Sequence, residues 1–153
     1  MEYFHTKLKW DFYESPPTNK EIDFIEEKID IRFPRDFIAC VKDYNEGSPS
    51  PRIFDCKSQF DGKNIETSFG GLMSFNPEDI EYILQSYKVL RSEHSQDLIV
   101  PFAADAGGNL ICFDYRETKE NPPVVYWEHE AYPPEKAITY LAPTFTDFLK
   151  MLR

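Results

Sequence analysis

Two neighbouring stretches, residues 101–116 (PFAADAGGNLICFDYR) and 124–130 (VVYWEHE), hold most of the side chains that could do chemistry. A nucleophile of the Cys–His–Asp type is available as Cys112, His129 and Asp114. Such a thiol needs an imidazole within hydrogen-bond reach, and usually a cation or a helix N-terminus to lower its pKa. Cys112 instead lies in an apolar run, where burial raises a thiol pKa. We therefore expect Cys112 to be a core residue.

The acidic residues around the histidine could ligate a metal ion or act as an acid–base pair. Glu128, His129 and Glu130 are consecutive, and consecutive residues of a strand point to opposite faces of a sheet. They therefore cannot converge on a metal ion without a bend. Asp105 could pair with Asp114 or Glu128 as general acid and base, but 27 acidic residues bring some pairs close by chance. A hydrolase using Asp105, Asp114 and His129 is a further alternative.

The Gly-Gly segment of residues 105–109 (DAGGN) could in principle hold a phosphate. It lacks the spacing of both glycine-rich phosphate motifs, and it leads into a strand rather than a helix. It is typical of a tight turn whose glycines permit positive φ. The sequence therefore implies no cofactor and no metal here.

The chain around this turn predicts an antiparallel meander. Apolar runs at residues 98–104 and 110–115 flank the turn, and a proline-ended polar loop leads to the run at 124–130. Residues 48–75 predict two further strands, at 52–56 and 69–75, separated by a polar loop.

Helices precede the meander. Thr18 and Glu21 form a capping box that starts a helix over residues 18–28. A second helix begins near Pro34 and ends before Gly47. The expected buried positions are Ile22, Ile25, Ile29, Phe37, Ile38, Val41 and Tyr44. The opposite face of the first helix carries Asp23, Glu26, Glu27 and Asp30, which we expect to be solvated.

Two more helices are predicted. Asn76 and Pro77 indicate the cap and first turn of the third, and Thr144 with Asp147 indicates the start of the last. Their expected buried positions are Ile80, Ile83, Leu84, Tyr87, Leu90, Phe145, Phe148, Leu149 and Leu152. Residues 1–16 read as an arm or edge strand. The pattern predicts an α+β fold, a single domain over residues 1–153 with helices on a mostly antiparallel sheet of about four to six strands.

The composition limits the classes of partner that the protein could bind. The 153 residues carry a formal charge of −10, which repels phosphate backbones and anionic membranes and suits a basic protein partner. The same charge could serve solubility alone. Three widely spaced cysteines fit neither a disulfide framework nor a zinc ribbon, and no signal core or membrane-length segment is present. We therefore expect a cytoplasmic protein that contacts neither nucleic acid nor membrane directly.

Four motifs in order resemble the SUKH superfamily, also called the cell-wall assembly regulator family. The run IEEKIDIRFPRDFIACVKDYNEG resembles its opening helices, and LIVPFAADAGGNLICFDYR its central hairpin. PVVYWEHE resembles the following strand, and FTDFLKML the closing helix. The matching positions are Glu26, Phe33, Pro34, Phe37, Tyr44, Asn45, Gly47, Pro101, Phe102, Asp105, Gly107, Gly108, Asn109 and Asp114. Glu46 interrupts the usual Asn-Gly, and residues 48–75 are too divergent to assign.

The resemblance implies an α+β fold without known catalytic residues. Bacterial members resemble immunity proteins that neutralise toxins, often nucleases, and fungal members resemble regulators of cell-wall synthesis. We therefore expect a non-enzymatic immunity protein with a basic toxin as partner, or alternatively a regulatory interaction module. The predicted partner contacts are Asp105, Asn109, Asp114, Tyr126, Glu128 and His129. For Tyr126 and Asp105, partial burial and turn capping are the alternatives, and we expect Trp127 in the core.

Overall fold

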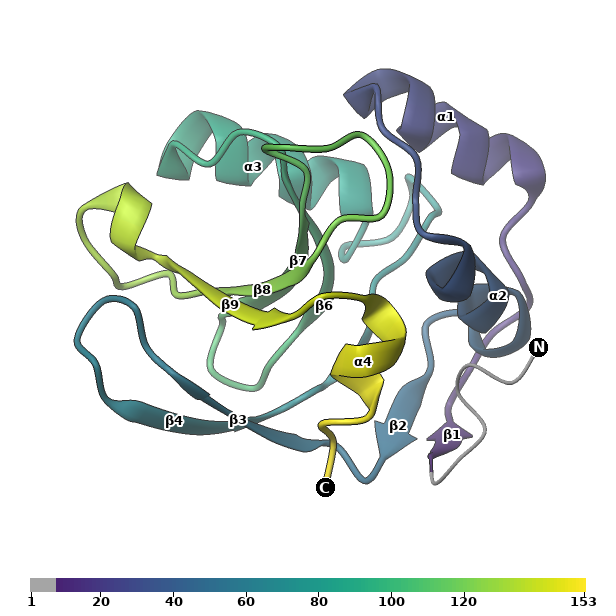
Figure 1. The fold of residues 1–153 in the computed structure, drawn as a ribbon. Helices are drawn as coiled ribbons and strands as arrows, with labels where there is room; N and C mark the ends of the chain where they lie inside the picture. The colour runs from purple at the N-terminus through teal and green to yellow at the C-terminus, as the bar shows by residue number, and fades with distance from the viewer. Residues whose placement is uncertain (1–7) are drawn as a thin grey trace.

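The centre of the protein is a five-stranded antiparallel sheet whose spatial order follows the chain (Figure 1). The computed structural model describes residues 8–153, so part of the predicted N-terminal arm lies outside the described residues. The predicted meander is confirmed, because the Gly-Gly turn joins the second and third strands of this sheet. The strands are β5 (Gly71–Leu72), β6 (Ile99–Ala104), β7 (Leu110–Asp114), β8 (Val124–Trp127) and β9 (Ile138–Ala142).

Two small antiparallel sheets lie beside the central one. β1 (Lys9–Asp11) pairs with β2 (Ser48–Ser50), so this part of the arm is an edge strand, as predicted. β3 (Ile53–Lys57) pairs with β4 (Asn64–Ser68). The prediction for residues 48–75 was partly wrong. β3 confirms the predicted strand at 52–56, but β4 lies in the expected loop, and of the predicted strand at 69–75 only Gly71–Leu72 form a strand. A polar strand such as β4 buries little and leaves no apolar pattern to detect.

The helices are α1 (Asn19–Ile29), α2 (Arg35–Tyr44), α3 (Ile83–His94) and α4 (Phe145–Leu149), with a short 3-10 turn at Pro134–Lys136. The α1 capping box is present: Thr18 Oγ1 accepts from Glu21 N at 3.1 Å, and Glu21 Oε1 accepts from Thr18 N at 2.9 Å. Glu26 is not simply solvated as predicted. Its Oε2 accepts from Phe33 N at 2.8 Å, so this carboxylate fixes the entry to α2.

The predicted start of the third helix was wrong. α3 begins at Ile83, and Ile80, expected in the core, is 98% exposed. Asn76 does act as a local cap, because its Oδ1 accepts from Glu78 N at 3.0 Å, but it closes a turn rather than a helix. Ser74 explains the difference. Its backbone N donates to Glu81 O at 2.8 Å and its O accepts from Ile83 N, so residues 74–82 form a hydrogen-bonded loop.

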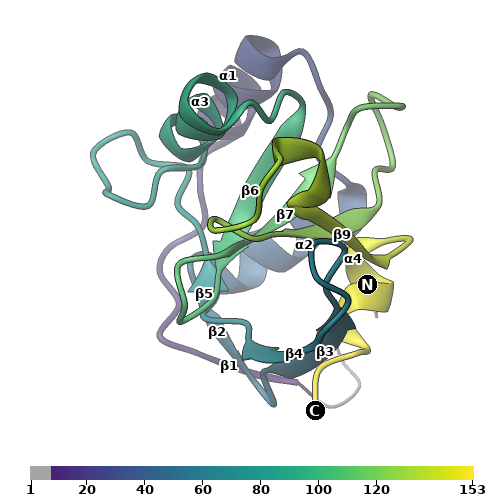
Figure 2. The same ribbon diagram turned by 90° about the vertical axis from the view of Figure 1, so that its left-hand side faces the viewer.

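Both faces of the central sheet are covered, which explains its continuous apolar runs. Phe37 of α2 is fully buried on one face and contacts the rings of Phe102, Phe113 and Phe145. On the other face Leu90 of α3 joins a second cluster, whose sheet members are Ile99, Cys112, Val125, Trp127 and Ile138. Figure 2 shows the β3–β4 hairpin beneath the central sheet and α3 above it. The α+β prediction is confirmed, as is the burial of Cys112 and Trp127. None of the helices described is long and apolar enough to cross a membrane.

Candidate functional site

The turn between β6 and β7 is closed by its own aspartate. Asp105 Oδ1 accepts from the backbone N of Gly107 at 2.8 Å and of Asn109 at 2.9 Å. Gly108 has φ +87°, which only glycine adopts without strain, whereas Gly107 has no positive φ. The expectation that both glycines supply this freedom therefore holds for one of them. Because the turn N–H groups point at Asp105, they are not available as a phosphate cradle.

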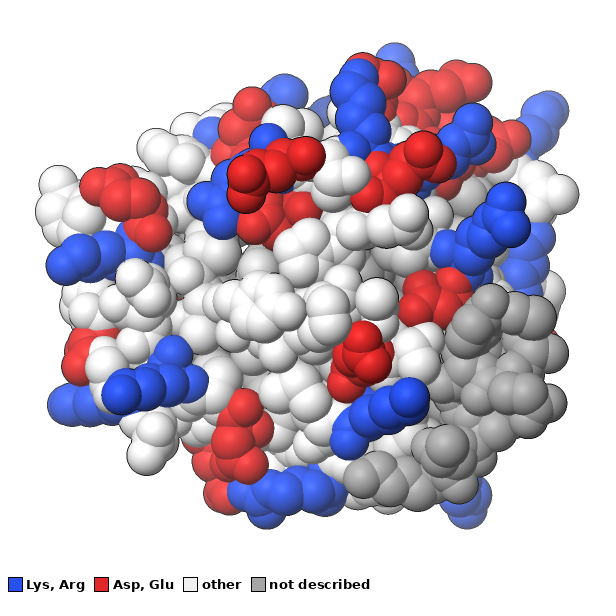
Figure 3. Space-filling model, viewed as in Figure 1, with Lys and Arg blue, Asp and Glu red and all other residues white. Residues whose placement is uncertain are grey.

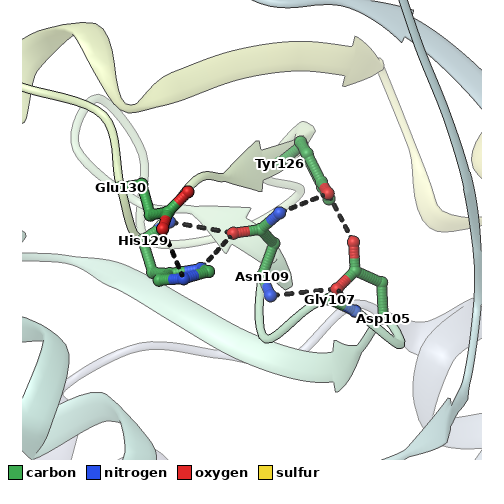
Figure 4. A network of polar contacts seen from close by, with 6 residues as sticks. All are labelled: Asp105, Gly107, Asn109, Tyr126, His129 and Glu130. Carbon is green, nitrogen blue, oxygen red and sulfur yellow. Dashed lines mark hydrogen bonds and ion pairs between the residues drawn. The ribbon is translucent and has the colours of Figure 1, made fainter.

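Tyr126 of β8 connects this turn to the sheet through hydrogen bonds of its hydroxyl group. Its side chain is 1% exposed, and its hydroxyl donates to Asp105 Oδ2 and accepts from Asn109 Nδ2 at 2.8 Å (Figure 4). Thr67 of β4 donates to the same Asp105 oxygen at 2.9 Å. Burial, together with the hydrogen bond to Asp105, raises the pKa of Tyr126 well above its usual value. The phenol therefore stays neutral and keeps donating.

Asn109 carries the network outward to His129. Its Oδ1 accepts from His129 N at 2.9 Å and lies 2.7 Å from His129 Nδ1. Because an amide oxygen can only accept, the hydrogen-bond pattern assigns a proton to Nδ1. The side chain of His129 is 41% exposed, and its Nε2 lies 3.9 Å from Glu130 Oε1. A continuous chain of hydrogen bonds thus runs from the buried Tyr126 to a histidine at the surface.

The other two predicted contacts lie apart from this network. Glu128 Oε1 accepts from Ser58 Oγ at 2.7 Å, which ties it to the β3–β4 hairpin. Asp114 ends β7 and forms a two-pronged ion pair with Arg116 at 2.8 and 2.9 Å. The four residue steps from Leu110 to Asp114 span roughly 14 Å. The structure therefore groups Asp105, Asn109, Tyr126 and His129, and leaves Asp114 at the far end of the strand.

The prediction that Glu128, His129 and Glu130 alternate between the two faces of a strand was wrong, because these residues are not in a strand. β8 ends at Trp127, and Ala131 N donates to Glu128 O at 3.2 Å, so these residues form a turn. His129 and Glu130 accordingly lie next to each other. The expected alternation failed because the strand ends three residues before the acidic run does.

The geometry gives the catalytic alternatives no support. Asp105 accepts four hydrogen bonds from Gly107, Asn109, Thr67 and Tyr126, and it lies far from Asp114. Burial raises the pKa of the Cys112 thiol well above its usual value, which favours the unreactive form. Within residues 8–153 no three His, Cys, Asp or Glu side chains come close enough to hold a metal ion. What the arrangement can do is present a fixed polar surface.

A cleft of about 330 Å³ adjoins His129, between the end of α3 and residues 128–137. His94 packs edge-on against Trp127, with ring centroids 4.8 Å apart, and both rings line the cleft together with Tyr132, which is 78% exposed. Its carboxylates are Glu93, Glu128 and Glu130. Sequence reasoning missed His94 and Tyr132. A tyrosine followed by Pro133-Pro134 in a polar segment was the only available signal for an exposed aromatic.

Acidic residues outnumber basic ones, and they are not spread evenly over the surface. Figure 3 shows charges of both signs around a largely uncharged centre, with acidic side chains gathered over α1. A groove beside α1 is lined by Asp23, Glu27 and Asp30 against Arg32 and Lys119. The surface thus carries several acid-rich hollows.

The fold and the site together define an α+β domain with a hydrogen-bonded polar network at the β6–β7 turn. Residues 16–151 match the SMI1 / KNR4 family (SUKH-1), and the chain belongs to this family. The chain is also similar to the SPbeta prophage-derived uncharacterized protein YokK of Bacillus subtilis (strain 168). The two are 25% identical over 153 residues, which cover 90% of this chain and 75% of that protein. The suspected SUKH resemblance is thereby confirmed.

Proposed function

We propose that the protein is a non-enzymatic immunity protein that binds and neutralises a basic, nuclease-type toxin. In this account Glu128, His129 and Glu130, which lies beside His129, contact the partner. Asp105, Asn109 and Tyr126 fix the position of His129 rather than touching the toxin. Asp114, paired with Arg116, lies outside this contact surface.

The observation that carries the proposal is the family match combined with a polar surface that is ordered before binding. Each hydrogen bond from Tyr126 to His129 is already made, so little side-chain freedom remains to be lost on association. The charge of −10 favours a basic partner by electrostatic steering. The prophage origin of the Bacillus subtilis relative fits a gene that travels with a partner gene. Three free cysteines fit a reducing compartment such as the cytoplasm.

Co-expression in bacteria tests this proposal. The proposal predicts that a neighbouring gene encodes a toxin-like domain, and that cells producing this domain survive when they also produce the protein. The double variant His129→Ala/Glu130→Ala should lose protection, while Glu117→Ala, an exposed carboxylate beyond the other end of β7, should retain it. Survival without the protein, or equal protection by the double variant, would remove the support for this surface.

A regulatory interaction module is the second candidate, because the chain belongs to the SMI1 / KNR4 family and the fungal members of the superfamily resemble regulators of cell-wall synthesis. Such a module would bind a host factor and have no toxin gene beside its own. Affinity capture from its own cells separates the two, because a toxin domain and a host regulatory protein are distinct on identification by mass spectrometry.

A further inference from the structure

The cleft beside His129 has an unpaired hydrogen-bond donor in its aromatic wall. Trp127 lines this cleft and is only 5% exposed. Within residues 8–153 the side-chain polar atoms that are both sealed from solvent and unpaired are Trp10 Nε1 and Asn45 Oδ1. The indole nitrogen of Trp127 makes no hydrogen bond with the described residues and is not one of these two atoms, so it is open to solvent. A ligand in the cleft could therefore supply the acceptor that this N–H group lacks.

The rest of the lining is rich in acceptors. The contact with Asn109 places the ring proton of His129 on Nδ1, so Nε2 is left as an acceptor. Glu130 Oε1 lies 3.9 Å from this nitrogen (Figure 4), and a donor placed between the two could reach both. Glu93 and Glu128 add two more carboxylates, and among the described residues that line the cleft there is no lysine or arginine.

Hydrogen bonds hold the walls of the cleft in place. Gln96, just after α3, is buried, and its Nε2 donates to Pro134 O at 2.6 Å. Glu128 N donates to Ala137 O at 3.0 Å, which closes the loop after β8. These bonds join the helix end, the strand end and the loop without using the indole N–H group. The cleft is therefore formed before a ligand binds, and binding costs little further ordering.

The lining excludes the simplest ligands. A metal ion would leave the indole donor unpaired, and within residues 8–153 no three His, Cys, Asp or Glu side chains come close enough to hold one. An apolar side chain would leave the carboxylates without a counter-charge. A basic residue in a peptide chain carries both a main-chain carbonyl for the indole and a cationic group for the carboxylates. The largely exposed Tyr132 supplies a ring against which such a cation could pack.

We infer that this cleft receives a basic residue, arginine or lysine, from a loop of the protein partner. The main-chain carbonyl of that residue accepts from the Trp127 indole N–H group. Its cationic group lies among the carboxylates of Glu93, Glu128 and Glu130. The inference deepens the proposed function by naming the chemistry of the contact beside His129, and it rests on that function only for the source of the basic residue.

A titration followed by two-dimensional NMR tests the cleft without any partner. The chain has two tryptophans, so the variant Trp10→Phe assigns the indole signal of Trp127. The probe is the blocked tripeptide alanine–arginine–alanine, and we expect a saturable downfield shift of the Trp127 indole proton as it gains an acceptor. The norleucine tripeptide keeps the carbonyls but lacks the cation, so it should bind at least about fivefold more weakly. Propylguanidinium has the cation without a carbonyl and should leave the indole proton unshifted.

Two double variants test the carboxylates. Glu93→Gln/Glu130→Gln should weaken binding of the arginine tripeptide at least about fivefold, because it removes two of the three charges. Glu117→Gln/Glu120→Gln removes the same charge from exposed residues beyond the other end of β7 and should change nothing. An unshifted indole proton, equal binding of the norleucine tripeptide, or equal affinity of the two double variants would each overturn the inference.

The partner gives a separate readout. If the arginine tripeptide binds as expected and no toxin is captured, the cleft contact stands and the toxin proposal falls. With a captured toxin, Glu93→Gln should weaken binding about two- to fivefold, since it removes one exposed charge of the cleft. If the toxin binds Glu93→Gln as tightly as wild type but loses affinity for His129→Ala/Glu130→Ala, the toxin proposal stands and the basic-residue contact falls.

Discussion

Replacing Tyr126 by phenylalanine should test whether the buried phenol holds the candidate site together. The change removes only the hydroxyl, which donates to the Asp105 carboxylate and accepts from Asn109. A hydrogen bond to a charged group contributes about 1.5–3 kcal/mol and a neutral one about 1 kcal/mol, and solvent recovers part of this. We therefore expect the free energy of unfolding to fall by about 2–3 kcal/mol. For a chain of this length that lowers Tm by roughly 5–10 °C.

Chemical denaturation with urea, fitted with a common slope, measures this difference, and Tyr140→Phe is the matched control. Tyr140 lies on β9 and is 60% exposed, so losing its hydroxyl should change stability by less than about 0.5 kcal/mol. If Tyr126→Phe is within about 0.5 kcal/mol of wild type, the phenol is not the anchor that the hydrogen bonds indicate. An equal loss in Tyr140→Phe would show a general effect of the substitution.

Three further predictions concern the core, a thiol and an ion pair. Phe37→Ala should destabilise by about 3–5 kcal/mol in denaturation, against less than about 1 kcal/mol for the partly exposed Phe60→Ala. Cys56, whose pKa burial raises to about 11, should react with a thiol reagent roughly tenfold faster per pH unit from pH 8 upward, and a flat profile would contradict this. The Arg153 guanidinium lowers the pKa of Asp55 in the folded protein. The ion pair therefore stabilises the fold fully above the usual aspartate pKa, and this stabilisation is lost as the pH falls through the lowered pKa of Asp55. In Arg153→Gln an NMR titration should find the Asp55 pKa back near its usual value.

The elements with strong periodicity were predictable from the sequence. The capping box at Thr18, the apolar face of α2 and the meander around the Gly-Gly turn follow from local rules, and the structure confirms them. α3 was placed too early because Asn76, Pro77 and the acidic residues after them imitate a helix start. The loop instead closes on Ser74 through hydrogen bonds to Glu81 and Ile83, which no local pattern reveals.

The candidate site was predictable in its residue types but not in its connections. Asp105 was expected either to cap the turn or to contact a partner, and the structure shows the cap. That Tyr126 lies beneath the turn depends on the register of β7 and β8, which pairs Ile111 with Tyr126. Register and long-range packing are set by the whole fold, so a single sequence carries little trace of them.

The most direct test of the central claim is a binding titration between this protein and the partner recovered by affinity capture, followed by calorimetry. We expect a 1:1 complex with a basic toxin domain that weakens as salt is raised, because opposite charges steer the association. His129→Ala/Glu130→Ala should weaken it at least about tenfold, and Glu117→Ala should not. A partner that is acidic, a complex insensitive to salt, or equal binding by the double variant would contradict the account.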